Sequence, residues 1–456
     1  MARPRRTRCR PNSLSLAVLV QLACAFAAQA QESNDDVIRL EGHGGPVKSV
    51  VVREDGLFAL SGGFDYSLIL WSLNGARGVM AHRFLDHEAA VNAVAFASRD
   101  WAITGSDDGT VGVFDLSERK LVKRLEGHKA KIVDVAVSPD GTLAASASWD
   151  RTARVWDLDS LEERAVLEGH RGNVNAVAFA DSGHVYTASY DGTIRLWDVA
   201  GAKEIRSVYR HGWGVNVLRT MPDGRLLFGA IDGTTAVLDP QSGKIDKILQ
   251  PFQGPVLSLG VWPKHGLLAA GGGDGVLRVW DLTTFELKYE YENPHGPIWA
   301  LALSGDGKVI YLAGLDDYVI GWQIDPLKSF EPVASKFPRR FQLTDDMDAG
   351  ERQFARKCSV CHTLTPDSEN RAGPTLYGLF GRKAGSLPGY VYSDALRNAD
   401  IVWTEKTIAR LFDEGPDRVT PGSKMPLQRL KSVEDRDALI AFLKRATGPM
   451  QGHLNN

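Results

Sequence analysis

Residues 186–198 read YTASYDGTIRLWD, and this stretch contains the pattern that decides the fold of most of the chain. An Asp is followed six residues later by a large apolar residue, here Asp191 and Trp197, and the alternating segment between them is typical of a β-strand. The pair occurs seven times, at Asp65/Trp71, Asp108/Phe114, Asp150/Trp156, Asp191/Trp197, Asp232/Leu238, Asp274/Trp280 and Asp316/Trp322. A period of 41 to 43 residues over this length indicates a repeat architecture.

A second residue type keeps the same period. A His stands 21 or 22 residues before six of the seven Asp residues, at positions 43, 87, 128, 170, 211 and 295, and Gln253 takes this place once. Turn pairs such as Asp140-Gly141 separate the expected strands. Six stretches after the apolar positions, such as 120–125 and 204–209, can each be the outer strand of their repeat. The seventh repeat is followed by Pro326, so we expect residues 37–40 to supply its missing strand.

These motifs resemble those of the WD-repeat family. Trp-Asp closes three repeats, at Trp156, Trp197 and Trp280. Gly-His pairs open three of the repeats, at His43, His128 and His170. The resemblance covers residues 37–325 and implies a seven-bladed β-propeller of four-stranded antiparallel sheets. We assign residues 31–325 to this domain.

The repeated His and Asp invite comparison with a hydrolase triad, because Ser106, Ser148 and Ser189 stand two residues before their Asp. Several copies of one catalytic apparatus around a ring would be unusual, so we interpret the set as a buried hydrogen-bond network. The residue just before each Asp lies on one face of the ring. Three of these residues are large aromatics, Phe64, Trp149 and Tyr190, and we predict that they form a docking face for a protein partner or for the chain's own C-terminal domain. The alternative is that they pack on neighbouring loops.

A different motif follows a segment at 326–346 that we interpret as a linker. Cys358-Ser-Val-Cys361-His362 has the spacing of a covalent haem attachment site, where two thiols three residues apart reach the vinyl groups and the adjacent His becomes an axial iron ligand. A zinc site is the alternative, but no second Cys or His pair follows at zinc-ligand spacing.

Residues 347–449 are similar to class I cytochromes c of the mitochondrial and α-proteobacterial kind. Gly350 and Phe354 match the first helix of that family, and Leu439 and Phe442 match the last helix, which packs across it. The resemblance implies one covalent haem c on Cys358 and Cys361, with His362 and Met425 as the iron ligands. It further implies that the Pro374 carbonyl accepts the axial His proton, and that the haem-pocket supports are Arg382, Tyr392 and Trp403. Leu396 and Leu411 replace polar residues that are common in this family.

The first residues have the features of a targeting segment. Residues 1–30 combine five Arg, an apolar run and Ala28-Gln29-Ala30, a pattern typical of a signal peptide that directs export to the periplasm. A mitochondrial presequence, leading to the intermembrane space, is the alternative. We expect no membrane-spanning segment, and residues 450–456 are expected to be a disordered tail.

The fold class that follows is multidomain: an all-β seven-bladed WD-repeat propeller followed by an all-α class I cytochrome c domain. Residues 348–449 carry 16 basic and 13 acidic side chains, and the chain between the first 31 residues and this domain has a net negative charge. This charge argues against binding to nucleic acid. We expect an electron-transfer protein rather than an enzyme, with redox protein partners and the propeller as a docking scaffold. Two alternatives remain: a redox enzyme whose propeller binds a substrate or second cofactor, and a scaffold in which the haem is a redox-sensing switch.

Overall fold

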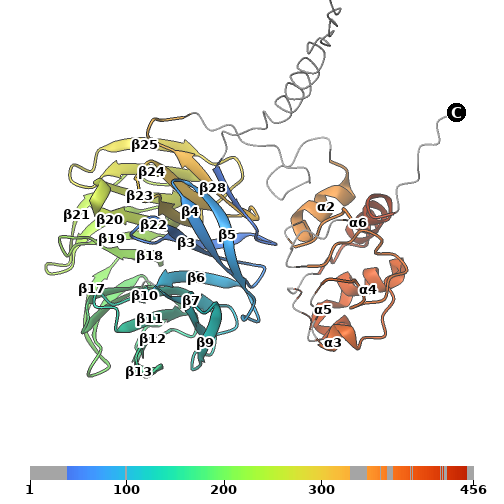
Figure 1. Ribbon diagram of the computed structural model, residues 1–456, viewed down its shortest axis with the longest axis horizontal. Helices are drawn as coiled ribbons and strands as arrows, with labels where there is room; N and C mark the ends of the chain where they lie inside the picture. Colours follow the sequence, from blue (N-terminus) through green and yellow to red (C-terminus); the bar gives the residue numbers. More distant parts are fainter. Residues whose placement is uncertain are drawn as a thin grey trace, which may run out of the picture. The chain divides into compact units, whose positions relative to one another are not determined.

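A computed structural model describes residues 38–97, 100–328, 347–359, 361–366, 373–390, 392, 394–421, 423, 425 and 429–448. The predicted signal peptide and C-terminal tail lie outside these residues, as does most of the predicted linker. The strands and the helices form separate domains (Figure 1), and each is described by itself. Among the described residues, no helix is both long enough and apolar enough to cross a membrane.

The N-terminal domain contains seven four-stranded antiparallel sheets, which we number as blades 1 to 7. Blades 1 and 2 comprise β2 (Val47–Val52), β3 (Phe58–Gly63), β4 (Leu68–Asn74), β5 (Arg77–Phe84), β6 (Val91–Phe96), β7 (Trp101–Ser106), β8 (Val111–Asp115) and β9 (Lys120–Leu125). Blades 3 and 4 comprise β10 (Ile132–Val137), β11 (Leu143–Ser148), β12 (Thr152–Asp157), β13 (Glu162–Glu168), β14 (Val174–Asp181), β15 (His184–Ser189), β16 (Thr193–Asp198) and β17 (Lys203–Arg210). Blades 5 and 6 comprise β18 (Val215–Thr220), β19 (Leu226–Ala230), β20 (Thr235–Asp239), β21 (Lys244–Ile248), β22 (Val256–Trp262), the short helix η1 (Pro263–His265), β23 (Leu267–Gly272), β24 (Val276–Asp281) and β25 (Leu287–Glu292).

Blade 7 is closed by the start of the domain. Its strands are β26 (Ala300–Leu303), β27 (Val309–Ala313) and β28 (Tyr318–Gln323), and β1 (Ile38–Glu41) is hydrogen-bonded beside β28 as the fourth strand. The prediction that residues just before the first repeat complete the last sheet is confirmed. The first strand of each blade contacts the first strand of the next, and β26 contacts β2, so the ring is continuous.

One side chain on an inner strand ties each blade to the next for six of the seven junctions. Amide side chains donate to backbone carbonyls at three junctions, as in Asn175 Nδ2 to Val215 O at 3.1 Å. At two others a side-chain oxygen accepts from a backbone N–H, as in Asp134 Oδ2 from Val177 N at 3.1 Å. The full set of inner-strand side chains is Ser49, Asn92, Asp134, Asn175, Asn216 and Ser258. At the closing junction, the Val47 N–H donates to the Gly314 and Asp316 carbonyls.

The repeated His lies beside the Asp of its blade in six of the seven blades, and in blade 6 the Gln253 N–H donates to Asp274 instead. In blade 1, His43 Nδ1 lies 3.0 Å from Asp65 Oδ1 and His43 Nε2 lies 2.6 Å from Ser61 Oγ. The Trp71 indole N–H donates to the same Ser61 hydroxyl at 2.8 Å. The buried network predicted from the sequence is therefore present, and it connects a loop, two strands and the core Trp.

The identity of the hydroxyl in this network was predicted wrongly. Ser106, Ser148 and Ser189 do not bond to the His; instead, each donates to a backbone carbonyl of the preceding loop at 3.1 to 3.3 Å. The hydroxyl partner of the His stands four residues before the Asp, and these partners are Ser61, Thr104, Ser146 and Thr187. Blade 1 therefore has a complete network although Gly63 occupies the position of Ser106.

The C-terminal domain is helical among its described residues. Its elements are α2 (Ala349–Lys357), α3 (Asp394–Arg397), α4 (Glu405–Glu414), α5 (Pro416–Val419) and α6 (Val433–Ala446). Its core includes Phe354, Ile408, Phe412, Leu439 and Leu443, which come from α2, α4 and α6. The seven-bladed β domain and this helical domain confirm the predicted fold class.

Candidate functional site

The first helix of the C-terminal domain is fixed by its cap and by its crossing with the last helix. The Asp348 carboxylate accepts from the Glu351 N–H at 2.9 Å at the start of α2. A Cβ atom on Gly350 would lie 2.1 Å from the Ala438 carbonyl oxygen, so only glycine allows α2 and α6 to approach this closely. The rings of Phe354 and Phe442 pack beside this crossing with centroids 5.4 Å apart. The predicted pairing of these helices is therefore confirmed.

The Cys-Cys-His motif follows α2 directly. Cys358 ends the helix, and its carbonyl accepts from the backbone N–H groups of Cys361 and His362 at 3.0 and 2.9 Å, which turns both residues back toward the core. Cys358 is buried, Cys361 is partly buried, and the two sulfurs are not joined in a disulfide. Burial raises the pKa of the Cys358 thiol to about 12, because the enclosed thiolate would lose its hydration.

His362 is held in a single orientation by the turn that contains Pro374. Its Nδ1 lies 2.7 Å from the Pro374 carbonyl oxygen, which can only accept, so Nδ1 carries the proton and the Nε2 lone pair is free for a metal. A Cβ atom on Gly373 would lie 2.3 Å from His362 Cε1, so the ring occupies the space of a side chain at position 373. Burial lowers the pKa of His362, which favours the neutral form that binds iron.

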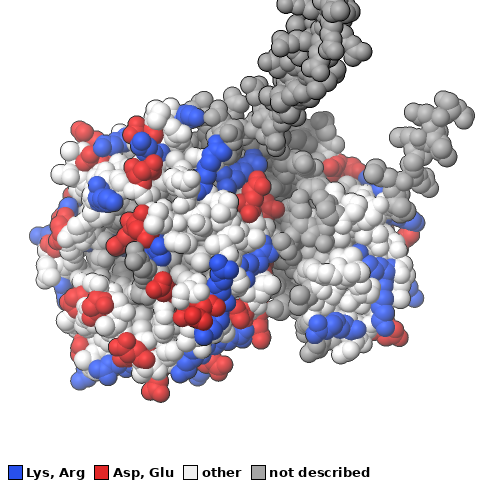
Figure 2. Space-filling model, viewed as in Figure 1, with Lys and Arg blue, Asp and Glu red and all other residues white. Residues whose placement is uncertain are grey.

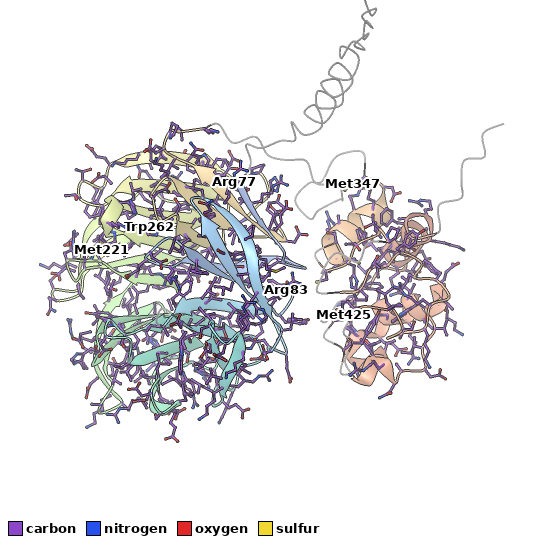
Figure 3. All side chains as sticks on the ribbon, viewed as in Figure 1. Arg77, Arg83, Met221, Trp262, Met347 and Met425 are labelled. Carbon is purple, nitrogen blue, oxygen red and sulfur yellow. The ribbon has the colours of Figure 1, made fainter. Side chains whose placement is uncertain are left out.

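Met425 lies on the wall of the same cavity as the motif. The cavity is lined by Cys358, Cys361, His362 and Met425, although Met425 is 63 positions beyond His362 in the sequence. Figure 3 labels Met425 among the side chains of the helical domain, where it packs on the core cluster. The rest of the wall is mainly apolar and includes Leu376, Leu379, Leu396, Trp403, Ile408, Leu411, Phe412 and Leu443.

The three predicted support residues also line this cavity. Arg382 donates to the Thr375 and Tyr377 carbonyls at 2.6 and 3.0 Å, and burial lowers the pKa of its guanidinium. Burial raises the pKa of Tyr392, although the nearby Arg382 charge opposes the shift. Trp403 is joined to this segment through its backbone, because its N–H donates to the Arg382 carbonyl at 2.9 Å. Their role as haem-pocket supports stays a prediction.

These residues fit a haem c. An apolar cavity wall carries two cysteine sulfurs and a neutral imidazole with a free Nε2, and a thioether lines the same cavity, which is the donor set of a six-coordinate haem iron. The described residues contain no group of three or more His, Cys, Asp or Glu placed to bind a metal ion. When bound, the haem supplies one-electron exchange between ferrous and ferric iron.

The predicted docking residues of the propeller differ in their exposure. Trp149 and Tyr190 are 44% and 59% exposed. Phe64 is partly buried, and its ring centroid lies 5.9 Å from that of Trp299 on a neighbouring blade. A further aromatic residue, Trp213, was not predicted for this face and is 61% exposed on the loop before blade 5. The flanking Gly212 and Gly214 mark a loop in the sequence, but they do not show which way the ring points.

Comparisons with known proteins address both domains. The WD domain, G-beta repeat family matches residues 35–72, 78–115, 119–157, 161–198 and 246–281. Among solved structures, the WD40 β-propeller domain of Doa1 is similar with a TM-score of 0.56 at 23% identity, covering 62% of this chain and 94% of that one. At this identity the likeness concerns the fold alone. The WD-repeat family matches do not cover blades 5 and 7, whereas the structure contains both blades.

The helical domain matches the cytochrome c family over residues 347–447. Cytochrome c of Gibberella zeae is 42% identical over 102 residues, which are 22% of this chain and 95% of that protein. Cytochrome c of Arabidopsis thaliana is 42% identical over 105 residues, which are 23% of this chain and 93% of that protein. The fold and the site thus define a c-type haem protein that functions in electron transfer. Through its C-terminal domain the chain belongs to the cytochrome c family, and it carries one covalent haem c, with Cys358 and Cys361 matching the attachment motif.

Proposed function

We propose that this protein is a periplasmic electron carrier in which His362 and Met425 are the axial ligands of the haem iron and the propeller docks the redox partner. The observation that carries the proposal is the hydrogen bond from His362 Nδ1 to the Pro374 carbonyl, which directs Nε2 into the cavity that Met425 lines. Two protein ligands leave no open iron position for a substrate, and this favours electron transfer over oxygen or peroxide chemistry.

Spectroscopy of the purified holoprotein tests the ligand set. A pyridine haemochrome should show thioether-linked haem at one haem per chain, and the ferric protein should be low-spin with the weak Met-to-iron charge-transfer band. Met425→Ala should abolish that band and open the iron to added imidazole. The matched control is Met347→Ala, which removes a buried Met of the same domain that does not line the cavity. A low-spin, unchanged Met425→Ala protein would refute Met425 as a ligand.

The export proposal rests on residues 1–30, which lie outside the described residues. It predicts a mature N-terminus near Gln31 and recovery of the haem-bearing chain in the periplasmic fraction. A chain that retains its first residues and stays in the cytoplasm would overturn this part without affecting the proposed haem ligands.

The enzyme alternative has a specific place to bind a substrate. The inner strands enclose a central channel with a volume of about 680 Å³, and Asp134, Arg219 and Trp262 are among its lining residues. The carrier proposal predicts that the holoprotein shows only haem c absorption and that its haem is reduced by small donors without consuming an organic substrate. A second chromophore, or substrate-dependent haem reduction that is lost in Arg219→Ala, would favour the enzyme.

A further inference from the structure

The loops on one face of the propeller differ sharply between blades. We call loop face the surface made by the loops that join the second and third strands of each blade and the loops that join one blade to the next, because both kinds meet at the His–Asp pairs. On blades 3 to 5 this face carries three exposed aromatic side chains, Trp149, Tyr190 and Trp213. A Cβ atom on Gly214 would lie 3.0 Å from the Tyr190 ring, so the Tyr190 and Trp213 loops touch.

Five cationic side chains lie on these loops or at the strand end that leads into them. Lys131 Nζ lies 3.5 Å from the Trp149 ring centroid, which holds a positive charge over the exposed indole. Three more are exposed and come from the same loops, namely Lys129, Arg151 and Arg171, and the exposed Arg210 ends the outer strand β17. Where the structure is described, none of the five forms an ion pair.

The carboxylates of these loops are already engaged. Asp150, Asp191 and Asp232 each lie within 3.0 Å of the His of their own blade. Glu126 and Glu168 stand at the ends of the outer strands β9 and β13, as Arg210 does at the end of β17, so the loops themselves carry Lys129, Lys131, Arg151 and Arg171. The free charge beside the three rings is therefore positive.

The equivalent loops of the other four blades have the opposite character. Residues 44–46, 64–66, 88–90, 107–109, 253–255, 273–275, 296–298 and 315–317 contain no Lys or Arg. They contain seven acidic residues, at positions 65, 88, 107, 108, 274, 316 and 317. Asp65, Asp108 and Asp316 pair with the His of their own blade as Asp150, Asp191 and Asp232 do, which leaves four others. On the face of the propeller seen in Figure 2, Lys and Arg are interspersed with Asp and Glu. The arc of blades 3 to 5 is thus a local cationic and aromatic surface on an acidic domain.

We propose that the loop face of blades 3 to 5 binds an acidic polypeptide segment of the redox partner, one in which carboxylates alternate with apolar side chains. This inference rests on the proposed docking role of the propeller and names the chemistry of its partner. Exposed Trp and Tyr side chains are the residues that most often anchor protein interfaces, and the cations around them match carboxylates in charge. The acidic loops on the remainder of the face restrict such a segment to this arc.

A protein segment fits this surface better than a nucleic acid or an anionic membrane. A polyphosphate or a charged bilayer extends well beyond three blades and would meet the acidic loops of the other four, where like charges repel it. A short acidic segment places its charge on the arc alone. The three rings further favour a ligand with apolar side chains, since aromatic anchors contribute by burial of apolar surface.

The test uses the full-length holoprotein and a short fluorescein-labelled peptide in which Glu alternates with Phe and Leu. Fluorescence anisotropy should show saturable binding that weakens as salt is raised, whereas a matched peptide with Lys in place of Glu should not bind. The triple variant Lys129→Glu/Arg151→Glu/Arg171→Glu should weaken binding at least about tenfold. Trp213→Ala should weaken it without changing the salt dependence.

A control variant carries the same charge change away from the loop face. Lys244→Glu/Lys247→Glu/Lys264→Glu changes three exposed lysines on β21 and η1 and should bind the peptide like the native protein. No saturable binding up to about 1 mM, equal loss in both triple variants, or binding to phosphatidylserine vesicles that the loop-face variant abolishes would each overturn the inference. The haem spectrum is measured in every variant, so failure of the docking surface is separable from failure of the electron carrier.

Discussion

Gly350→Ala gives the sharpest test of how the haem domain is packed. The added Cβ would lie 2.1 Å from the Ala438 carbonyl oxygen and 2.7 Å from Phe442 Cβ. An ordinary contact of this kind is about 3.5 Å, so α2 and α6 would have to separate by roughly 1.4 Å at their crossing. The closest atom belongs to the backbone and cannot rotate away. Overpacking of this kind destabilises a domain by about 3 kcal/mol.

The assay is thermal unfolding of the holoprotein, followed by haem absorption for the helical domain and by Trp fluorescence for the propeller. A loss of about 3 kcal/mol in a domain of about 100 residues lowers its Tm by roughly 12–24 °C, while the propeller transition stays in place. Gly448→Ala is the control, because a Cβ there meets only the Lys444 carbonyl at 3.5 Å. If the haem transition moved by less than about 2 °C in Gly350→Ala, or equally in both variants, the packing argument would be wrong.

Three further predictions follow from other contacts. Asn175→Ala removes the side-chain bond between blades 4 and 5 and leaves the Val215 carbonyl without its partner, so the propeller should lose about 1 kcal/mol in urea unfolding; an unchanged midpoint would contradict this. Burial disfavours the ionised Asp191, but hydrogen bonds from His170, Thr193 and the Arg171 N–H outweigh it and hold the pKa of Asp191 below its ordinary value. The stability that this carboxylate contributes is therefore present above about pH 4 and lost as the pH falls further, and Asp191→Asn should be less stable at neutral pH with a shallower acid limb in a pH series of unfolding curves. Gly373→Ala displaces the His362 ring, so the ferric protein should gain a high-spin component by electron paramagnetic resonance; a fully low-spin spectrum would refute the close contact.

The sequence was sufficient for the blade count because the period depends on local strand chemistry. Each Asp and the large apolar residue six positions later belong to one turn and the strand after it, so their spacing is kept in every repeat. The closing strand was predictable for a related reason. A three-stranded last blade leaves an exposed sheet edge, and the unpaired strand segment before the first repeat can cover it. In the structure β1 pairs with that edge.

The hydroxyl partner of the His was not predictable in this way. Thr104 and Ser106 lie two apart on β7, so both side chains face the same side of the sheet, and only strand twist and distance decide which one reaches His87. The exposure of Trp213 was also not predictable, because it depends on the conformation of its loop and not on a repeated sequence pattern. In the haem domain, the motif alone identified the cysteines and His362, whereas Met425 was predicted only through the resemblance to cytochromes c, because it lies 63 positions from His362.

The strand that closes the ring has a consequence for the order in which this protein matures. β1 is made before any complete blade, but its partner β28 ends at Gln323, so β1 waits for nearly the whole propeller to be synthesised. The helical domain begins after that point, at α2. Every chain long enough to receive its haem has therefore already produced all the strands that its propeller needs, and a chain interrupted within the propeller has neither a closed ring nor the cysteines for haem attachment.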